Sequence, residues 1–172
     1  MLIGFGKIKN CNLFAAAFIA SCLALCVVWG YQIFAKVMPC HLCLLERLPL
    51  YAYLGAFALY SLVKRFYNKK WLDFCLATIG SLLFVSGACL AFYHILVVLE
   101  VVSSSCGLSL EDITSSINQT APSLASCTDT SFAILGLPAV YLCFAFFTLL
   151  SLCFCIFVTT FATTFATNLY KK

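Results

Sequence analysis

The chain has 172 residues, of which 64% are hydrophobic and only 9% are charged, whereas soluble globular domains average roughly 45–50% and 25%. This composition excludes a soluble globular domain. The net charge of +4 comes from basic residues that flank apolar segments, so it reports membrane topology and gives no indication of nucleic-acid binding.

Four apolar segments run along the chain, at about 13–35, 44–63, 72–98 and 132–158. A helix needs about 20 residues to cross the hydrocarbon core of a bilayer, and each segment is long enough. We therefore expect an all-α membrane protein, in which residues 1–172 form a single integral membrane domain. Its predicted fold is a four-transmembrane-helix bundle in the lipid bilayer. The sequence leaves open whether the 159–172 tail extends the fourth helix.

The basic residues predict how this bundle is oriented. Eight of the ten lie on one side of the predicted membrane: Lys7, Lys9, Lys64, Arg65, Lys69, Lys70, Lys171 and Lys172. Only Lys36 and Arg47 fall on the other side. By the positive-inside rule, both termini are cytoplasmic. The outer loops, 36–43 and 100–131, then face a compartment in which disulfides persist.

The N-terminal segment also has features of a cleaved signal. Lys7 and Lys9 precede an apolar run, as in a signal peptide, and Ile19-Ala20-Ser21-Cys22 resembles a lipoprotein cleavage site. Cleavage there would leave only 23–35, which is too short to cross a bilayer. We therefore expect the first segment to remain as an uncleaved anchor.

Four of the twelve cysteines fall on the predicted outer side. Cys40 and Cys43 form a CxxC motif, and Cys106 and Cys127 lie within the long polar stretch 103–131. Two cysteine pairs on one side of a membrane indicate a series of thiol–disulfide exchanges, each of which passes two electrons. The remaining eight lie in or beside apolar runs, where a thiol behaves as a small hydrophobe: Cys11, Cys22, Cys26, Cys75, Cys89, Cys143, Cys153 and Cys155.

The CxxC motif is compatible with a zinc site, a redox pair or a chance spacing. Structural zinc needs four ligands, and only His41 and the distant outer cysteines are candidates to complete the set, so we expect no metal. A redox CxxC needs one cysteine with a lowered pKa, which a helix N-terminus or a nearby cation provides. Cys43 lies just before the second predicted span, with Arg47 four residues further on, and this favours a redox pair.

Arg47 and His94 are the other candidate site residues. Arg47, beside Glu46, is either an anchor that extends its charge to water, with Glu46 a surface charge, or a group that stabilises a thiolate or donates to a quinone carbonyl. His94 lies roughly 36 Å above Lys70 at about 1.5 Å per residue, near the depth of Arg47. It is either a hydrogen-bonded structural residue or a ligand and proton-transfer group.

Residues 39–47, Pro-Cys-His-Leu-Cys-Leu-Leu-Glu-Arg, resemble the P-C-x-L-C-x-x-[EQ]-R signature of the disulfide bond formation protein B (DsbB) family. The four-span layout and the second outer cysteine pair agree with it. So do two further motifs, Tyr93-His94 and Gly136-Leu137-Pro138. The resemblance covers nearly the whole chain, and the nine-residue signature is its most specific part.

The resemblance implies a membrane oxidoreductase of the bacterial inner membrane, with its redox loops facing the periplasm. Such proteins reoxidise a DsbA-like periplasmic thiol oxidase and pass the electrons to the membrane quinone pool, either ubiquinone or menaquinone. The family pattern makes Cys106 the residue that forms the mixed disulfide and leaves Cys127 to attack a Cys40–Cys43 disulfide. It also implies that Cys43 contacts the quinone and that Arg47 polarises it, with His94 a third quinone-binding candidate.

Two alternatives remain at this stage. The vitamin K epoxide reductase family joins the same chemistry to a similar bundle, but its loop cysteine pair precedes the CxxC, whereas here the CxxC comes first. A non-enzymatic membrane protein with a static Cys106–Cys127 disulfide would gain about 3 kcal/mol of stability from it. That alternative leaves the CxxC without a role.

Overall fold

The computed structural model describes residues 10–36, 39–67, 70–102, 133–134 and 137–170. Its helices are α1 (Asn10–Ala35), α2 (His41–Leu45), α3 (Leu48–Phe66), α4 (Lys70–Val98) and α6 (Ala139–Tyr170). Two short strands, β1 (Ala133–Ile134) and β2 (Leu137–Pro138), pair antiparallel, with Ala133 opposite Pro138 and Ile134 opposite Leu137. The described part of the chain is therefore almost entirely helical.

Four helical stretches are long and apolar enough to cross a membrane: Leu13–Phe34, His41–Phe66, Trp71–Val98 and Ala139–Thr163. The predicted four-transmembrane-helix fold is thus confirmed. Six of the eight boundaries differ from the predicted spans, by one to seven residues, and two of these differences bear on the site. The second stretch begins at His41 instead of 44, because α2 starts directly after Cys40 and already contains Cys43. The fourth stretch begins at Ala139 instead of 132, because Leu137 and Pro138 form the strand β2, which pairs with β1.

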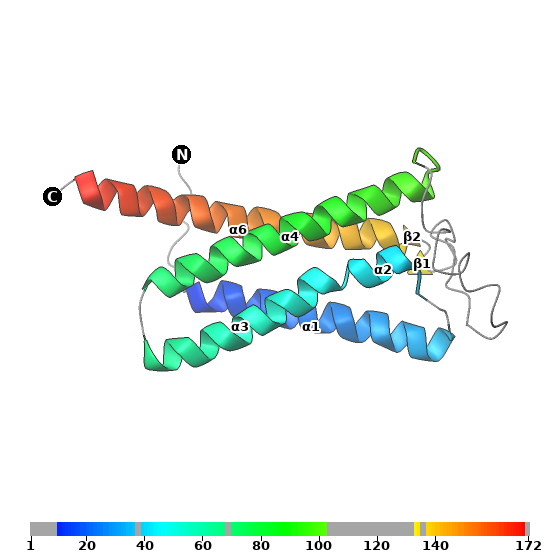
Figure 1. The fold of residues 1–172 in the computed structure, drawn as a ribbon, viewed down its shortest axis with the longest axis horizontal. Coiled ribbons are helices and arrows are strands. Elements are labelled where there is room, and N and C mark those ends of the chain that lie inside the picture. The colour runs from blue at the N-terminus through cyan, green and yellow to red at the C-terminus, as the bar shows by residue number, and fades with distance from the viewer. Residues whose placement is uncertain (1–9, 37–38, 68–69, 103–132, 135–136, 171–172) are drawn as a thin grey trace, which may run out of the picture.

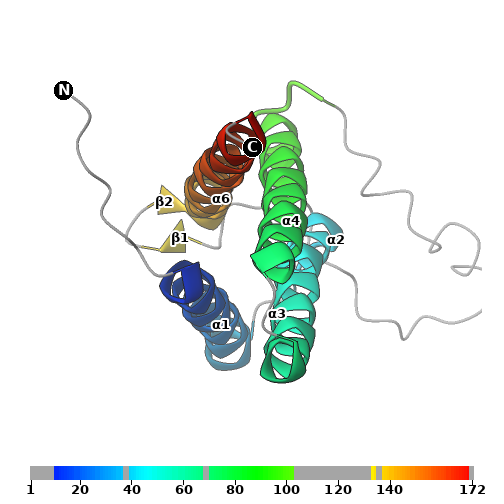
Figure 2. The ribbon, with the colours of Figure 1, turned by 90° about the vertical axis from the view of Figure 1, so that its left-hand side faces the viewer.

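The long helices lie side by side and place the CxxC at one end of the bundle (Figures 1 and 2). This end, which we call the site end, holds α2, the two strands and the last turns of α1 and α4. The start of α1, the connection from α3 to α4 and the end of α6 lie at the opposite end. Lys64 and Arg65, in the last turn of α3, lie there too. The helix α6 runs to Tyr170, so it includes most of the 159–172 tail.

The most extensive contact between helices joins α4 to α6. Gly80 and Gly87 of α4 face Phe154 and Phe147 of α6, and a methyl group added at either glycine would overlap the facing ring. Both phenylalanine side chains are buried, at 0% and 2% exposure. Small residues at helix contacts let backbones approach closely within a membrane, where dispersion contacts hold helices together. The two glycines therefore set the α4–α6 spacing.

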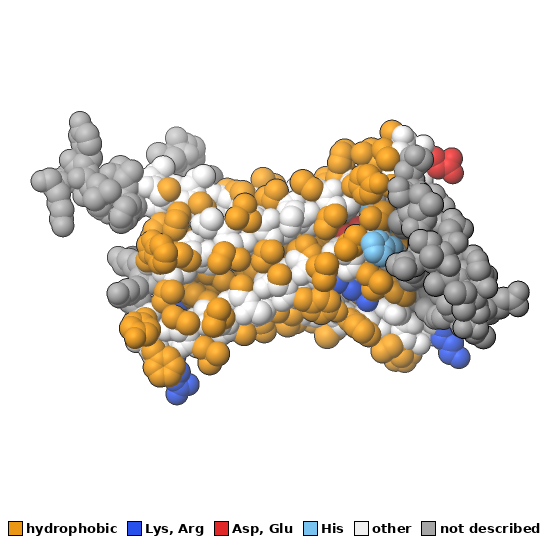
Figure 3. Space-filling view, viewed as in Figure 1, with side chains coloured by type: hydrophobic (Ala, Val, Ile, Leu, Met, Phe, Trp, Pro, Cys, Tyr) orange, Lys and Arg blue, Asp and Glu red, His pale blue; other side chains and the backbone are white. Residues whose placement is uncertain are grey.

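An aromatic core joins the remaining helices. The Tyr53 hydroxyl, in α3, donates a hydrogen bond to the Phe14 carbonyl oxygen of α1 at 3.1 Å, so this buried polar group is satisfied. At the opposite end from the site, Lys64 and Asp73 form an ion pair at 2.8 Å between α3 and α4. Outside this core, hydrophobic side chains cover most of the lateral face in view (Figure 3), as expected for contact with lipid.

Candidate redox site

The second span is broken into two helices directly after the CxxC. Pro49 has no N–H to donate to the carbonyl of Leu45, and its ring would clash with that carbonyl in a continuous helix. Accordingly α2 ends at Leu45 and α3 begins at Leu48. Glu46 and Arg47 occupy the turn between them. Their side chains contact different helices, Glu46 reaching α4 and Arg47 reaching α1.

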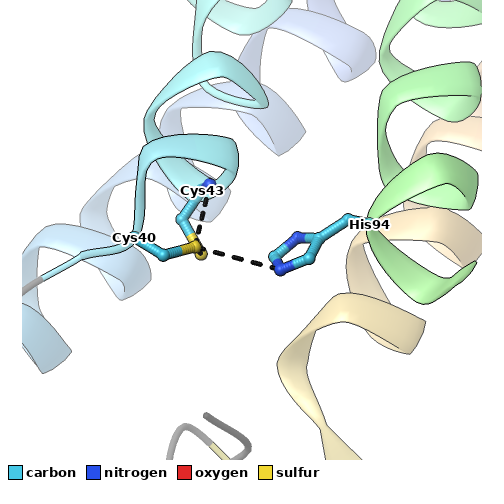
Figure 4. A group of neighbouring side chains, drawn as sticks. All are labelled: Cys40, Cys43 and His94. Atoms are coloured by element: carbon cyan, nitrogen blue, oxygen red, sulfur yellow. Dashed lines mark hydrogen bonds between the residues drawn. The ribbon is translucent and has the colours of Figure 1, made fainter. Parts of the chain in front are cut away.

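The two CxxC thiols lie together at the start of α2 (Figure 4). Cys40 is the N-cap residue, and its Sγ accepts a hydrogen bond from the Cys43 backbone N–H at 3.2 Å. The two sulfur atoms are 2.7 Å apart and share a further hydrogen bond. Cys40 is buried and Cys43 half-buried. This is the arrangement of a pair that can interconvert between dithiol and disulfide.

The environment of Cys40 favours its thiolate. The hydrogen bond with the Cys43 thiol, and then the one with His94, lower the pKa of Cys40 below its ordinary value. The sequence pointed to Cys43 as the residue beside a helix N-terminus. Because α2 begins at His41, three residues earlier than expected, Cys40 holds the capping position instead.

His94 connects the thiol pair to a carboxylate. Its Nε2 atom lies 3.9 Å from Cys40 Sγ, and its Nδ1 atom lies 2.7 Å from Glu46 Oε1. An ionised carboxylate only accepts hydrogen bonds, so the imidazole N–H is the donor. His94 and Glu46 are both buried, at 5% and 6% exposure. Glu46 is therefore part of the site and is not a surface charge.

Arg47 lies on the other side of the turn and is buried at 8% exposure. Its Nη1 donates to Gln32 Oε1 at 3.1 Å, and its guanidinium carbon is 5.7 Å from the centroid of the Trp29 ring. Its Nε is buried and has no hydrogen-bond partner among the described residues. An anchor that extends to water would keep this group solvated, so the observed position favours a site residue.

Three residues that the sequence did not select contribute to the site. Glu46 orients His94, Gln32 binds Arg47, and Cys143 of α6 lies beside the Glu46 carboxylate. The available signal was polarity, because Gln32 and Glu46 are polar side chains at the ends of apolar spans, where such groups need a partner. Cys143 offered no signal, since it falls in an apolar run like the other seven cysteines of its class.

The structure thus brings together three of the predicted site residues, Cys40, Cys43 and His94. Arg47 lies in the turn after α2, and its side chain contacts Gln32 and Trp29 of α1. The pair Cys40–His94 joins residues 54 positions apart. The other two predicted catalytic residues, Cys106 and Cys127, lie outside the described residues. Their roles remain predictions.

Comparison with known proteins identifies the family. The family model described as "Disulfide bond formation protein DsbB" matches residues 10–157, which is most of the chain. No curated protein and no solved structure matches the chain. The match includes the CxxC, the Glu46–Arg47 turn and His94, the residues that build the site. The chain therefore belongs to the DsbB family, and this membership implies a membrane oxidoreductase role in disulfide bond formation.

Proposed function

We propose that the chain is a protein-dithiol:quinone oxidoreductase that generates disulfides for a DsbA-like thiol oxidase. The observation that carries this proposal is the group of Cys40, Cys43, His94, Glu46 and Arg47 at one end of a four-helix bundle, in which every residue except the half-buried Cys43 is buried. A CxxC thiol pair, a buried cation and a buried imidazole–carboxylate pair thus lie at the same end of the bundle. Family membership supports the same reaction class.

The cysteines carry the electrons in two exchanges. A thiolate of the reduced partner attacks the Cys106–Cys127 disulfide at Cys106, forming a mixed disulfide and releasing Cys127. The partner's second thiol resolves this intermediate and leaves the partner oxidised. Cys127 then attacks the Cys40–Cys43 disulfide, and Cys106 completes the exchange. Two electrons have then moved to Cys40 and Cys43, and the outer pair is again a disulfide.

Exchange between sulfur atoms moves disulfides but does not create them, so the reduced CxxC needs an electron acceptor. A bound quinone would supply that chemistry by taking up two electrons and two protons. The site fits such a group, because the Arg47 Nε–H is a buried donor without a partner among the described residues and a quinone carbonyl is an acceptor. His94 is suited to handle a proton near Cys40, because Glu46 holds its ring.

The same proposal includes a location. The basic residues support a bacterial inner-membrane protein with cytoplasmic termini and with the site end facing the periplasm. Lys64 and Arg65, at the end of the bundle opposite the CxxC, agree with that orientation. A periplasmic site would meet both the partner and an oxidising compartment.

The test is quinone reduction by the purified chain in detergent, with a reduced DsbA-like protein as donor. We expect one quinone to be reduced for each partner disulfide formed, with ubiquinone or menaquinone, and no reduction by Cys43→Ser. Partner oxidation without reduction of either quinone would contradict the proposal. So would outer cysteines that stay oxidised when quinone is removed, because a static disulfide behaves in that way.

A further inference from the structure

Three metal-binding atoms converge at the site end of the bundle. The sulfur atoms of Cys40 and Cys43 and a ring nitrogen of His94 all lie within 4.8 Å of one another. Figure 4 shows the imidazole directed at the sulfur pair from the facing helix. His94 is 54 residues from Cys40 along the chain, so sequence spacing does not predict this set. Only the packing of α4 against α2 brings His94 to the CxxC.

We propose that the reduced protein binds a thiophilic divalent cation, Zn²⁺, through Cys40, Cys43 and His94, and that this binding holds the CxxC in its reduced form. The binding itself rests on geometry and ligand chemistry alone. Its consequence, a block of reoxidation by quinone, rests on the proposed function. The site would therefore make disulfide generation sensitive to soft metals.

The donor set is the one that Zn²⁺ prefers. Cysteine thiolates and imidazole nitrogen are its usual protein ligands, and sites with three protein ligands keep the fourth position for water. With Zn–S bonds of about 2.3 Å, two sulfur ligands at a tetrahedral angle are separated by roughly 3.8 Å. The sulfur atoms are 2.7 Å apart now, so coordination requires the two thiols to separate by about 1 Å. Rotation of the half-buried Cys43 side chain provides such a movement.

Glu46 supplies the supporting contact that metal-bound histidines usually have. A histidine ligand commonly donates its other ring N–H to a carboxylate, which fixes the ring and the nitrogen that faces the metal. His94 Nδ1 lies 2.7 Å from Glu46 Oε1 while Nε2 faces Cys40 Sγ. With the Nδ1 proton on the Glu46 side, a metal that binds Nε2 needs only to displace any proton from that atom. The ring is thus held in the orientation that coordination needs.

The protonation and the redox state of the two cysteines both determine whether the site can bind a metal. Coordination by two thiolates neutralises Zn²⁺, and for two thiols it releases two protons without any electron transfer. A disulfide offers no thiolate, so the oxidised CxxC loses both sulfur ligands. Metal binding and disulfide formation therefore exclude each other at this site.

The test is metal binding to the purified full-length chain in detergent, without quinone or partner. Co²⁺ is the spectroscopic probe, because thiolate coordination gives charge-transfer absorbance, and Zn²⁺ is then added to displace it. We expect the reduced protein to bind Co²⁺ with thiolate absorbance that Zn²⁺ removes. The signal should be absent from protein oxidised at the CxxC. Equal binding by the reduced and oxidised forms would overturn the proposal without recourse to any variant.

Variants assign the ligands. Cys40→Ser should abolish the Co²⁺ signal, His94→Gln should weaken the affinity at least tenfold, and Glu46→Gln should weaken it about tenfold through the orientation of His94. His41→Gln is the matched control, because His41 adjoins Cys40 but is exposed and lies outside the three-residue group. Unchanged binding in His94→Gln, or an equal loss in His41→Gln, would contradict the assignment.

A last measurement separates this inference from the proposed function. Reduced protein incubated with Zn²⁺ should be reoxidised by quinone at least tenfold more slowly, and a chelator should restore the rate. Normal quinone reduction by a chain that binds no metal overturns the metal site alone. Metal binding by a chain that reduces no quinone overturns the proposed function alone.

Discussion

Arg47 holds one buried hydrogen-bond donor, its Nε–H, in a fixed position. Gln32 binds Nη1 on one side and the Trp29 ring lies near the guanidinium plane, while Nε is left without a partner among the described residues. A buried donor without an acceptor is costly, by roughly 1–3 kcal/mol. Such a cost is tolerated where an acceptor arrives during function. Arg47 is therefore the residue at which the proposed function is most directly tested.

We predict that Arg47→Lys raises the apparent KM for quinone at least several-fold. Lysine keeps the charge but lacks the planar fork of arginine, so it cannot bind Gln32 and also present a second fixed donor. One charge-assisted hydrogen bond contributes roughly 1.5–3 kcal/mol, which sets the upper limit of the effect. Quinone reduction is the measurement, and disulfide exchange from partner to chain should stay near normal. Unchanged quinone kinetics in a well-expressed variant would return Arg47 to the role of an interfacial anchor.

Gln32 is predicted to act as a positioning residue for Arg47. Gln32→Leu removes the acceptor of the 3.1 Å hydrogen bond, so the guanidinium loses its fixed orientation and the KM for quinone should rise several-fold with little change in kcat. Gln32→Glu retains an acceptor oxygen and should restore the wild-type KM. A fall in kcat without a change in KM, or no rescue by glutamate, would contradict this role.

At the scale of elements, the break at Pro49 determines which helices meet at the site. A continuous helix would keep Glu46 and Arg47 in regular helical geometry, whereas the turn between α2 and α3 lets them reach α4 and α1. Pro49 lies in the first turn of α3, where its missing N–H costs nothing. The sequence did not reveal α2, because five residues are too few to show a helical period. The CxxC was therefore expected in a loop and lies instead at a helix start.

Among the contacts between helices, the one between α4 and α6 can be tested most directly by a substitution. Gly87→Val places a branched side chain against the Phe147 ring, which is buried and has little room to move. Overpacking of this kind costs about 1–3 kcal/mol, so we expect a clear fall in the midpoint of thermal unfolding in detergent. Gly55→Val in α3 is the matched control, because no atom lies within 4 Å of the added group. Equal effects of the two substitutions would mean that α4 and α6 are not in close contact.

At the scale of the whole molecule, the number of spans and four of the seven residues of the candidate site could be predicted from the sequence. Span number follows from apolar length, which is local along the chain. The CxxC and Arg47 were found because they lie in one short motif. The partners of Arg47 and His94 were not found, because the Arg47–Gln32 and His94–Glu46 contacts link different helices. Only helix packing decides which polar residues meet, and an apolar pattern does not specify it.

The orientation of the bundle is a separate prediction. The basic residues place the site end outside, so an impermeant thiol reagent added to intact cells after reduction should label Cys40, Cys43, Cys106 and Cys127. Cys153 and Cys155, near the middle of α6 and within its apolar stretch Ala139–Thr163, are the internal control and should stay unlabelled. Labelling of Cys153 or Cys155 in intact cells would reverse the orientation.

The final prediction concerns the partner that supplies the electrons. In Cys127→Ala, Cys106 is a single thiol, so it forms an adduct by attacking the disulfide of an oxidised DsbA-like protein. This exchange breaks the partner's disulfide, joins Cys106 to the partner and frees the partner's second thiol, so a mixed disulfide should accumulate when oxidised partner is in excess. The forward reaction is trapped with the unsubstituted chain: a reduced partner that lacks its resolving cysteine attacks the Cys106–Cys127 disulfide at Cys106, releases Cys127 as a thiol and has no second thiol of its own to leave. The adduct is detected on non-reducing gels and should disappear when Cys106 is also replaced. An adduct that survives the loss of Cys106 would assign the attack to another cysteine. If no adduct forms even with the partner's resolving cysteine removed, then the outer pair does not exchange with such a partner. In that case any electrons that reach a quinone would have to enter at Cys40 and Cys43, at the site end of the bundle.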